Sequence, residues 1–424
     1  MSIDIKSVLK NSLFRGGAIF FIGGIIANVL NYVYRIVMGR MLGPEAFGEL
    51  IAIISLVLIL VVPSASIQAV AARFSAVLET QKLSRKLKNL FGYLTRVFSL
   101  ISLVLIIGAV VFAGEIQNFL NLSSQNYVYY LVGIVVVMLI AGVTKGILQG
   151  LKRFSKLSYA IMLEAALKVG LAVGLVALGF KMTGALAGFL IPLILVYFLT
   201  FYFLRDILSQ RGNNEEIAIE QKKEIWQYVF YSFLVFFFLN ILLNVDIILV
   251  KHYFPALEAG IYSGFATLGR AVFIAFILLA GILFPIVAFK QAKKEDYFHP
   301  LKIISLISFL IGGVGISIFF LFPKELLLLF FGNNYLAGAP FLGYYSLVMG
   351  ILGFIFLLSY FFMALNKFKF LYILAAGSIL EIVLISLWHS NFSQVISMFS
   401  IALIFTFFSL GFLIFLEKRN IKYA

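Results

Sequence analysis

The chain alternates between long apolar stretches and short polar segments along almost its whole length. The hydrocarbon core of a bilayer is about 30 Å thick, which about 20 helical residues can span. Twelve apolar stretches reach this length, at residues 14–38, 47–72, 89–112, 126–148, 157–179, 182–204, 225–250, 259–288, 298–322, 340–364, 368–388 and 392–416. Strands with open edges would leave unpaired backbone groups in lipid. The pattern therefore predicts an all-α integral membrane protein with about 12 transmembrane helices.

The composition agrees with a membrane protein and excludes several other classes. Charged residues make up 12% of the chain, whereas soluble domains carry about 25%. The net charge of +15 does not indicate a nucleic-acid partner, because the basic residues form short clusters between apolar stretches. The chain has no cysteine, and its three histidines lie far apart in the sequence. We therefore expect no disulfide, no metal centre and no cofactor.

The basic residues alternate across the expected membrane. Of the 33 lysines and arginines, 25 fall at the two termini or in the even-numbered connections and their flanks, and five fall on the other side. The other three, Lys145, Lys168 and Arg270, lie within spans. Cytoplasmic connections carry the excess of basic residues. We therefore expect a multi-pass protein of the cell (plasma or inner) membrane with both termini cytoplasmic and the first apolar stretch retained as a span.

The second half of the chain weakly repeats the first half at an offset of 212 residues. Gly39–Leu50 (GRMLGPEAFGEL) resembles Lys251–Tyr262 (KHYFPALEAGIY), which matches Gly48 with Gly260. The alternative is a chance similarity between short apolar segments. Repeats of six spans each would be parallel, as many transporters show. The predicted parts are an N-lobe of helices 1–6 at 1–204, a cytoplasmic linker at 205–224 and a C-lobe of helices 7–12 at 225–424.

Few polar residues interrupt the spans, and these are the candidate site residues. A charge within a span is costly and usually faces the interior of the bundle or a cavity. The candidates for binding an anionic substrate in a cationic cavity are Arg35, Lys168 and Arg270. The candidates for ion coupling or ion pairing are Asp246, Glu164 and Glu381. The polar lining of the cavity is expected from Asn28, Asn240 and Asn244.

Each candidate also has a purely structural interpretation. Glu164 and Lys168 lie four residues apart on one helix and could neutralise each other. Asp246 and Arg270 lie on consecutive helices and could form an ion pair. Arg35 could reach the outer headgroups, and the asparagines could hydrogen-bond between helices. The sequence leaves these alternatives open.

Several functions are disfavoured by what the sequence lacks. It has no Walker A motif, so the chain cannot hydrolyse ATP by that route. The connections on the outer side are short and poor in carboxylates, which a membrane glycan polymerase or ligase would need for catalysis or metal binding. We therefore expect a transporter rather than an enzyme.

Two stretches resemble a known family. Arg35–Ser66 (RIVMGRMLGPEAFGELIAIISLVLILVVPSAS) is similar to the first two helices of the polysaccharide-transport (O-antigen or oligosaccharide) flippases, in which an L-G-P-E-x-F-G turn leads into helix 2. Val245–Lys290 is similar to the matching part of their second lobe, with an Asp on helix 7, A-G-I-Y-S at the start of helix 8 and F-P near its end. These flippases belong to the multidrug/oligosaccharidyl-lipid/polysaccharide (MOP) exporter superfamily.

The resemblance implies a fold and a function. It implies two six-helix lobes in a V around a central cavity with alternating access. It also implies transfer of a polyprenyl-diphosphate-linked oligosaccharide from the cytoplasmic to the outer leaflet. The sequence departs from the family in one place, because Ala266 and Thr267 stand where members often carry an arginine, and Arg270 comes about one helical turn later.

The leading functional hypothesis is therefore a flippase for a lipid-linked oligosaccharide. Cationic side chains would bind the diphosphate, while the polyprenyl tail stays in lipid between the lobes. The expected partners are this substrate, membrane lipid, a coupling ion (Na⁺ or H⁺) and proteins of glycan assembly. The alternatives are a cation-coupled multidrug exporter of the same superfamily, which would favour acidic cavities, and an integral-membrane glycan polymerase or ligase.

The orientation can be tested in this cysteine-free chain. Single cysteines at Lys86, Asn118, Glu216 and Asn334 would be exposed to a membrane-impermeant maleimide in intact cells. We expect labelling at Asn118 and Asn334 only, because the positive-inside distribution places Lys86 and Glu216 in the cytoplasm. The reverse pattern of labelling would overturn the orientation.

Overall fold

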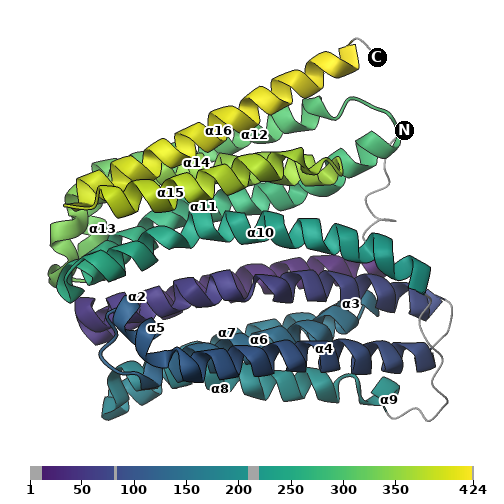
Figure 1. Ribbon diagram of the computed structural model, residues 1–424, viewed down its shortest axis with the longest axis horizontal. Helices are drawn as coiled ribbons and strands as arrows, with labels where there is room; N and C mark the ends of the chain where they lie inside the picture. Colours follow the sequence, from purple (N-terminus) through teal and green to yellow (C-terminus); the bar gives the residue numbers. More distant parts are fainter. Residues whose placement is uncertain (1–11, 81–83, 209–218, 423–424) are drawn as a thin grey trace. The chain divides into compact units, whose positions relative to one another are not determined.

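The structure is a computed structural model that describes residues 12–80, 84–208 and 219–422. Helices account for almost all of these residues, and no strand occurs among them (Figure 1). Half of the predicted linker, including Glu216, lies outside the described residues. The all-α prediction is confirmed for the part of the chain that the structure describes.

Ten stretches of the described helices are long and apolar enough to cross a membrane. Two of them are twice the necessary length and hold two crossings each. Ile19–Leu60 bends at Gly43, whose φ of 75° favours glycine, and Phe154–Tyr202 reverses its direction around Gly179. With these two divided, the count agrees with the predicted 12 helices.

The helices follow one another along the chain in the order of the predicted spans, with short helices at some connections. In the first half they are α2 (Ser12–Leu60), α3 (Val62–Thr80), α4 (Ser84–Val111), α5 (Ala113–Phe119), α6 (Asn126–Gly150), α7 (Phe154–Leu175), η1 (Val176–Phe180), α8 (Lys181–Tyr202) and α9 (Arg205–Leu208). In the second half they are α10 (Ile219–Tyr253), α11 (Ala256–Ala292), α12 (Phe298–Leu321), α13 (Pro323–Phe330), η2 (Asn333–Gly338), α14 (Ala339–Ala364), η3 (Phe368–Phe370), α15 (Leu371–Leu387) and α16 (Phe392–Lys422).

The chain forms two compact units. Unit 1 comprises Met1–Met41 and Leu60–Phe233, and unit 2 comprises Leu42–Ile59 and Leu234–Ala424. The boundary thus falls inside α10 rather than in the predicted linker at 205–224. Unit 2 also takes in the segment 42–59, because this segment packs against α11.

In unit 1, α6 packs closely against α3 through a stripe of glycines. Gly142, Gly146 and Gly150 repeat every four residues and so share one face of α6. A Cβ atom on Gly142 would lie 2.6 Å from the hydroxyl oxygen of Ser64, and one on Gly146 would lie 2.6 Å from the carbonyl oxygen of Gln68. Small residues of this kind let the backbones of membrane helices approach each other.

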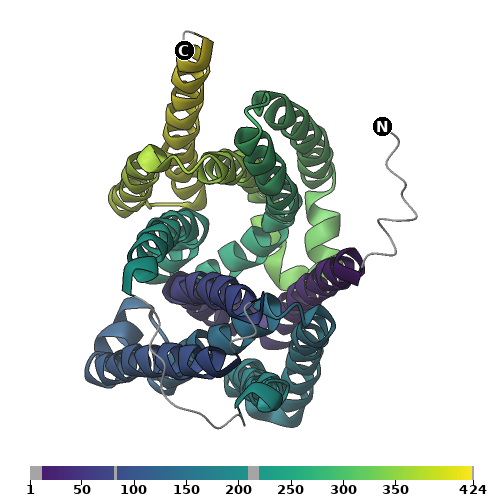
Figure 2. The same cartoon turned by 90° about the vertical axis from the view of Figure 1, so that its right-hand side faces the viewer.

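In unit 2, aromatic side chains fill the space where α11, α14 and α16 meet. The rings of Tyr262 and Phe265 lie 4.8 Å apart, and both contact Tyr345 and Phe392 with centroid distances of 5.7–5.8 Å. Edge-on pairs of this kind add to the stability gained by burial. α16, which borders this core, also lies side by side with α15 (Figures 1 and 2).

Two glycines that the sequence repeat matches are in contact in unit 2. A Cβ atom on Gly48 would lie 2.9 Å from the backbone nitrogen of Gly260, and one on Gly260 would overlap the carbonyl of Pro44. No side chain fits on either glycine without moving the backbone that faces it. This contact holds the segment 42–59 against the first turns of α11.

We predict that Gly260→Ala lowers the melting temperature of the purified protein in detergent, because its methyl group would overlap the backbone of Pro44. Overpacking of this kind costs about 1–3 kcal/mol. Gly281→Ala is the matched control on the same helix, since a Cβ atom there meets nothing within 4 Å. The control should be neutral or more stable, by up to about 1 kcal/mol. Equal melting temperatures for the two variants would contradict the close packing at Gly260.

Candidate functional site

Unit 2 contains a buried hydrogen-bonded group centred on Asp246, here called the unit 2 cluster: Asn244, Asp246, Tyr262, Arg270 and Tyr345. The Arg270 guanidinium forms an ion pair with Asp246 at 3.0 Å. The hydroxyls of Tyr345 and Tyr262 donate to the other oxygen of the Asp246 carboxylate at 2.7 and 3.1 Å. Asp246 is fully buried and Arg270 is 6% exposed. The carboxylate is therefore bonded at both oxygens, as a buried charge requires.

The rest of the Arg270 fork is also occupied. Its Nε donates to the hydroxyl of Tyr345 at 3.3 Å, and one terminal nitrogen donates to the Asn244 side-chain oxygen at 3.4 Å. The other terminal nitrogen also donates to the backbone carbonyl of Leu243. All three nitrogens of the guanidinium thus bond to groups of unit 2. The sequence left open whether Arg270 binds an anionic substrate or forms an ion pair with Asp246. The observed geometry is that of the ion pair.

Three helices supply the unit 2 cluster. α10 carries Asn244 and Asp246, α11 carries Tyr262 and Arg270, and α14 carries Tyr345. α10 and α11 are consecutive, with Pro255 at the turn between them, which brings Asp246 and Tyr262 to the same level. The asparagines of α10 bond along their own helix, because the Asn244 amide donates to the carbonyl of Asn240 at 3.0 Å.

Glu381 of α15 lies close to the unit 2 cluster but outside its bonds. Its side chain is fully buried, and neither carboxyl oxygen has a hydrogen-bond partner among the described residues. It interacts electrostatically with both Asp246 and Arg270. A buried ionised carboxylate without a partner is costly, so this position favours a neutral carboxylic acid or a bound cation.

Unit 1 contains a second group of charges within its spans, here called the unit 1 cluster: Arg35, Lys145, Glu164 and Lys168. Lys145 of α6 forms an ion pair with Glu164 of α7 at 2.7 Å. Lys168 interacts electrostatically with the other three residues and is 5% exposed. Glu164 is thus paired with Lys145, and Lys168 forms no ion pair among the described residues.

Lys168 is held by uncharged groups. Its ammonium donates to the side-chain oxygen of Asn31 at 2.9 Å and lies 3.7 Å from the ring centroid of Phe189. A buried cation over an aromatic face is stabilised by about 2 kcal/mol or more. These contacts orient Lys168, but they leave its charge without a carboxylate of its own.

The structure brings some of the predicted site residues together, whereas others have different partners from those considered from the sequence. Glu164 forms its ion pair with Lys145 of α6, and it interacts with Lys168 of its own helix only through electrostatic attraction. The side chains of Asn240 and Asn244 donate to backbone carbonyls of their own helix, α10, whereas Asn28 is exposed on α2. No group of three or more His, Asp or Glu side chains that could hold a metal ion occurs among the described residues.

Sequence reasoning did not find the two tyrosines of the unit 2 cluster. Tyr262 lies in the A-G-I-Y-S segment, so its place in a familiar motif was the only signal. Tyr345 lies in an apolar stretch with other aromatic residues, and nothing in the sequence distinguishes it from them. Its role follows only from the packing of α14 against α11.

Outside the spans of unit 1, an ion pair connects the start of α7 with α9, the short helix that follows α8. Arg153, at the start of α7, donates to both carboxylate oxygens of Asp206 on α9 and to the carbonyl of Phe203. This bidentate contact lowers the pKa of Asp206 below its usual value. Asp206 is more than half exposed, so the pair contributes little to stability.

Comparison with solved structures identifies the fold. The TM-score is 0.73 with "Lipid II flippase MurJ, inward closed conformation", at 17% identity over 93% of this chain and 87% of that chain. It is 0.72 with an inward-facing multidrug resistance MATE family transporter of the MOP superfamily, at 14% identity over 93% and 96% of the two chains. A MOP superfamily transporter from Pyrococcus furiosus gives 0.65, at 14% identity over 98% of each chain.

Sequence comparison identifies the family. None of the curated proteins matches this chain closely enough to count as a relative. The family described as "Polysaccharide biosynthesis protein" matches residues 13–291, well over half of the 424 residues. The match includes both stretches in which the resemblance was found and both buried clusters apart from Tyr345. The chain therefore belongs to the polysaccharide biosynthesis protein family and has the fold of the MOP exporters.

Proposed function

We propose that this membrane exporter moves a polyprenyl-diphosphate-linked oligosaccharide from the cytoplasmic to the outer leaflet of the cell membrane. The observation that carries the proposal is Lys168, a buried cation within the spans that forms no ion pair among the described residues. A net positive charge at this depth is costly unless an anion compensates it. The diphosphate of a lipid-linked oligosaccharide is such an anion.

The positions of the charges suit a phosphate group that travels along the spans. Glu164 and Lys168 lie about 6 Å apart along α7, since each residue adds 1.5 Å. Lys145 lies near one end of α6, and Arg35 lies toward the far end of the first crossing in α2. Lysine binds phosphate as a point charge, and arginine binds it through a bidentate fork. We assign diphosphate binding to Lys168 and Arg35, with Lys145 held by Glu164.

The role of Arg270 differs from that of Lys168. Because Asp246 and three other acceptors occupy its guanidinium, we assign Arg270 to holding α10, α11 and α14 together. Removing one partner of a buried ion pair leaves an unpaired charge, whereas removing both does not. A double variant, Asp246→Ala with Arg270→Ala, that melts below both single variants would contradict this assignment.

The side-chain contacts also decide which carboxyl group we assign to ion coupling, namely Glu381. Of the three carboxyl groups considered from the sequence, Asp246 is paired with Arg270 and Glu164 is paired with Lys145. Glu381 alone of these three is buried without a hydrogen-bond partner among the described residues. We propose that Glu381 takes up the coupling ion, H⁺ or Na⁺, close to Asp246.

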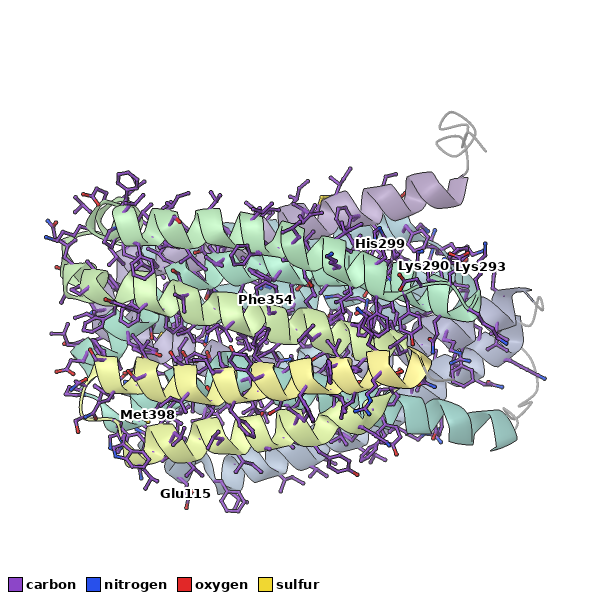
Figure 3. The ribbon with its side chains drawn as sticks, turned by 90° about the horizontal axis from the view of Figure 1, so that it is seen from above. Glu115, Lys290, Lys293, His299, Phe354 and Met398 are labelled. Carbon is purple, nitrogen blue, oxygen red and sulfur yellow. The ribbon has the colours of Figure 1, made fainter. Side chains whose placement is uncertain are left out.

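The proposed orientation places both termini in the cytoplasm, where proteins of glycan assembly would meet the transporter. In unit 2, Lys290, Lys293 and His299 lie together at one end of their helices, and Met398 lies near the other end (Figure 3). This grouping of basic residues supports the positive-inside assignment.

The nearest rival is a multidrug exporter, a function that the description of the MATE structure gives for that protein. Cationic drugs would favour a cavity with excess acid, whereas the buried Lys168 is a base that forms no ion pair among the described residues. The Pyrococcus furiosus transporter is described as having a binding pocket of reverse polarity that suggests a different function. The buried Lys168 therefore supports an anionic substrate for this chain, and we propose no enzymatic step.

We predict that Lys168→Met slows the flipping of a fluorescent diphosphate-linked oligosaccharide in proteoliposomes by about tenfold. The variant loses one charge-assisted hydrogen bond to phosphate, which is worth about 1.5–3 kcal/mol. Lys168→Arg should keep most of the activity, because it keeps the charge. Lys181→Met is the control, since Lys181 is an exposed cation on α8. Flipping at the normal rate in a folded Lys168→Met protein would exclude Lys168 from the binding site.

We also predict that Glu381→Gln abolishes the response of flipping to an imposed ion gradient. Glutamine has the shape of the protonated side chain but cannot exchange a cation. Wild-type proteoliposomes should flip faster under an inward gradient of either H⁺ or Na⁺, and the variant should flip at the same slow rate with and without it. Glu325→Gln, at an exposed site on α13, should respond as the wild type does. A retained response in Glu381→Gln would assign coupling to another group.

A further inference from the structure

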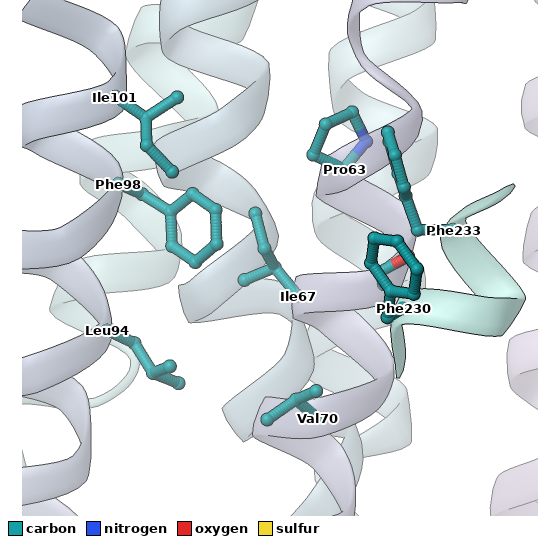
Figure 4. A pocket seen from close by; sticks show the side chains of 9 residues that line it. Pro63, Ile67, Val70, Leu94, Phe98, Ile101, Phe230 and Phe233 are labelled. Carbon is teal, nitrogen blue, oxygen red and sulfur yellow. The ribbon is translucent and has the colours of Figure 1, made fainter. Parts of the chain in front are cut away.

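An apolar groove in unit 1 lies between three spans and has no role in the mechanism described so far. Its volume is about 240 Å³, and residues of α3, α4 and α10 line it (Figure 4). Ser66 is the one polar side chain in its lining, which comprises Pro63, Ser66, Ile67, Val70, Leu94, Phe98, Ile101, Phe230 and Phe233. Such a lining binds hydrocarbon and excludes polar groups.

The groove has a buried floor and an exposed edge. Ile67 and Leu94 are 3% and 2% exposed, whereas Ile101 and Phe230 at the edge are 39% and 57% exposed. All of these residues lie within predicted spans, so the edge faces hydrocarbon rather than water. A chain that is already dissolved in the bilayer could therefore enter the groove sideways.

Basic residues lie beyond one end of the groove. The lining residues of α3 recur every three or four residues from Pro63 to Val70, and Arg73 is the next position of this series. Arg73 is exposed, as is Lys88 near the start of α4. This end of α3 and α4 is the one that the charge distribution assigns to the cytoplasm. An apolar slot followed by exposed cations matches a lipid with an anionic head.

We propose that this groove binds the first isoprene units of the polyprenyl chain, with the diphosphate at Arg73, before the headgroup moves inward. The inference rests on the proposed function and adds a site for the lipid part of the substrate. In a polyprenyl diphosphate, a single hydrocarbon chain is bonded directly to the phosphate. The single slot next to Arg73 therefore fits this lipid, whereas a glycerophospholipid has two chains separated from its phosphate by glycerol.

The depth of the groove supports a role in the loading of substrate. Phe230 and Phe233 lie in the second quarter of α10, and Leu94, Phe98 and Ile101 lie in the middle turns of α4. Within the predicted spans 225–250 and 89–112, Phe230, Phe233, Leu94 and Phe98 lie in the half nearer to the α3–α4 connection, and Ile101 lies at the middle. Under the proposed orientation this half is the cytoplasmic leaflet, in which a lipid-linked oligosaccharide is made available for flipping.

The experiment uses the full-length protein in proteoliposomes and a polyprenyl diphosphate that carries a photoreactive diazirine on its first isoprene units. We expect cross-links to α3 and α4 at the groove, identified by mass spectrometry. Ile67→Trp and Ser66→Leu should each reduce this labelling about tenfold, because added side-chain volume displaces buried hydrocarbon. Leu100→Trp is the control, since Leu100 is 58% exposed and does not line the groove.

The outcomes separate this site from the proposed function. Labelling that both groove variants reduce supports the site, even if the protein fails to flip a lipid-linked oligosaccharide, in which case only the proposed function is wrong. Wild-type protein that flips the substrate without cross-links at the groove overturns the site alone. Displacement of the probe by an equal amount of phosphatidylglycerol would also overturn it, because the groove would then hold ordinary membrane lipid.

Discussion

The cost of an uncompensated charge in hydrocarbon is the constraint on which the rest of this structure depends. Bilayer hydrocarbon offers no water to solvate an ion, so each buried charge must find its partners within the protein or in a ligand. Unit 2 meets this requirement internally, because Asp246 and Arg270 neutralise each other and two tyrosines complete the carboxylate. In unit 1, Lys168 is a buried cation that forms no ion pair among the described residues, and under the proposed function it attracts an anionic substrate.

The two halves of the chain share a pattern of helices but differ in their buried chemistry. The two glycines that the repeat matches, Gly48 and Gly260, contact each other where neither could carry a side chain. The charges do not follow the repeat. Unit 1 has the cationic cluster around Lys168, and unit 2 has the paired Arg270 with the unpartnered carboxyl of Glu381 beside it. Under the proposed function, one unit binds the substrate and the other takes up the coupling ion.

The apolar groove and the unit 1 cluster suit the two chemically different parts of one substrate. A lipid-linked oligosaccharide joins a hydrocarbon chain to a diphosphate, and no single kind of surface can bind both. The groove of α3, α4 and α10 offers hydrocarbon contacts. Lys168 and Arg35 offer positive charge within the spans. A transporter that keeps these surfaces separate can hold the tail in lipid while the headgroup moves through the protein.

The sequence by itself determined the number of crossings, the helical class and the short set of intramembrane charges. Span length and hydropathy are local properties that the bilayer thickness translates directly into helices. The sequence could not determine the partners of those charges. Glu164 had a neighbour at the right spacing on its own helix, yet it bonds to Lys145 on α6. Tyr345 had no distinguishing signal, yet it completes the Asp246 site. Only the tertiary structure decided these pairs, because contacts between helices depend on rotation and packing that a hydropathy pattern does not specify.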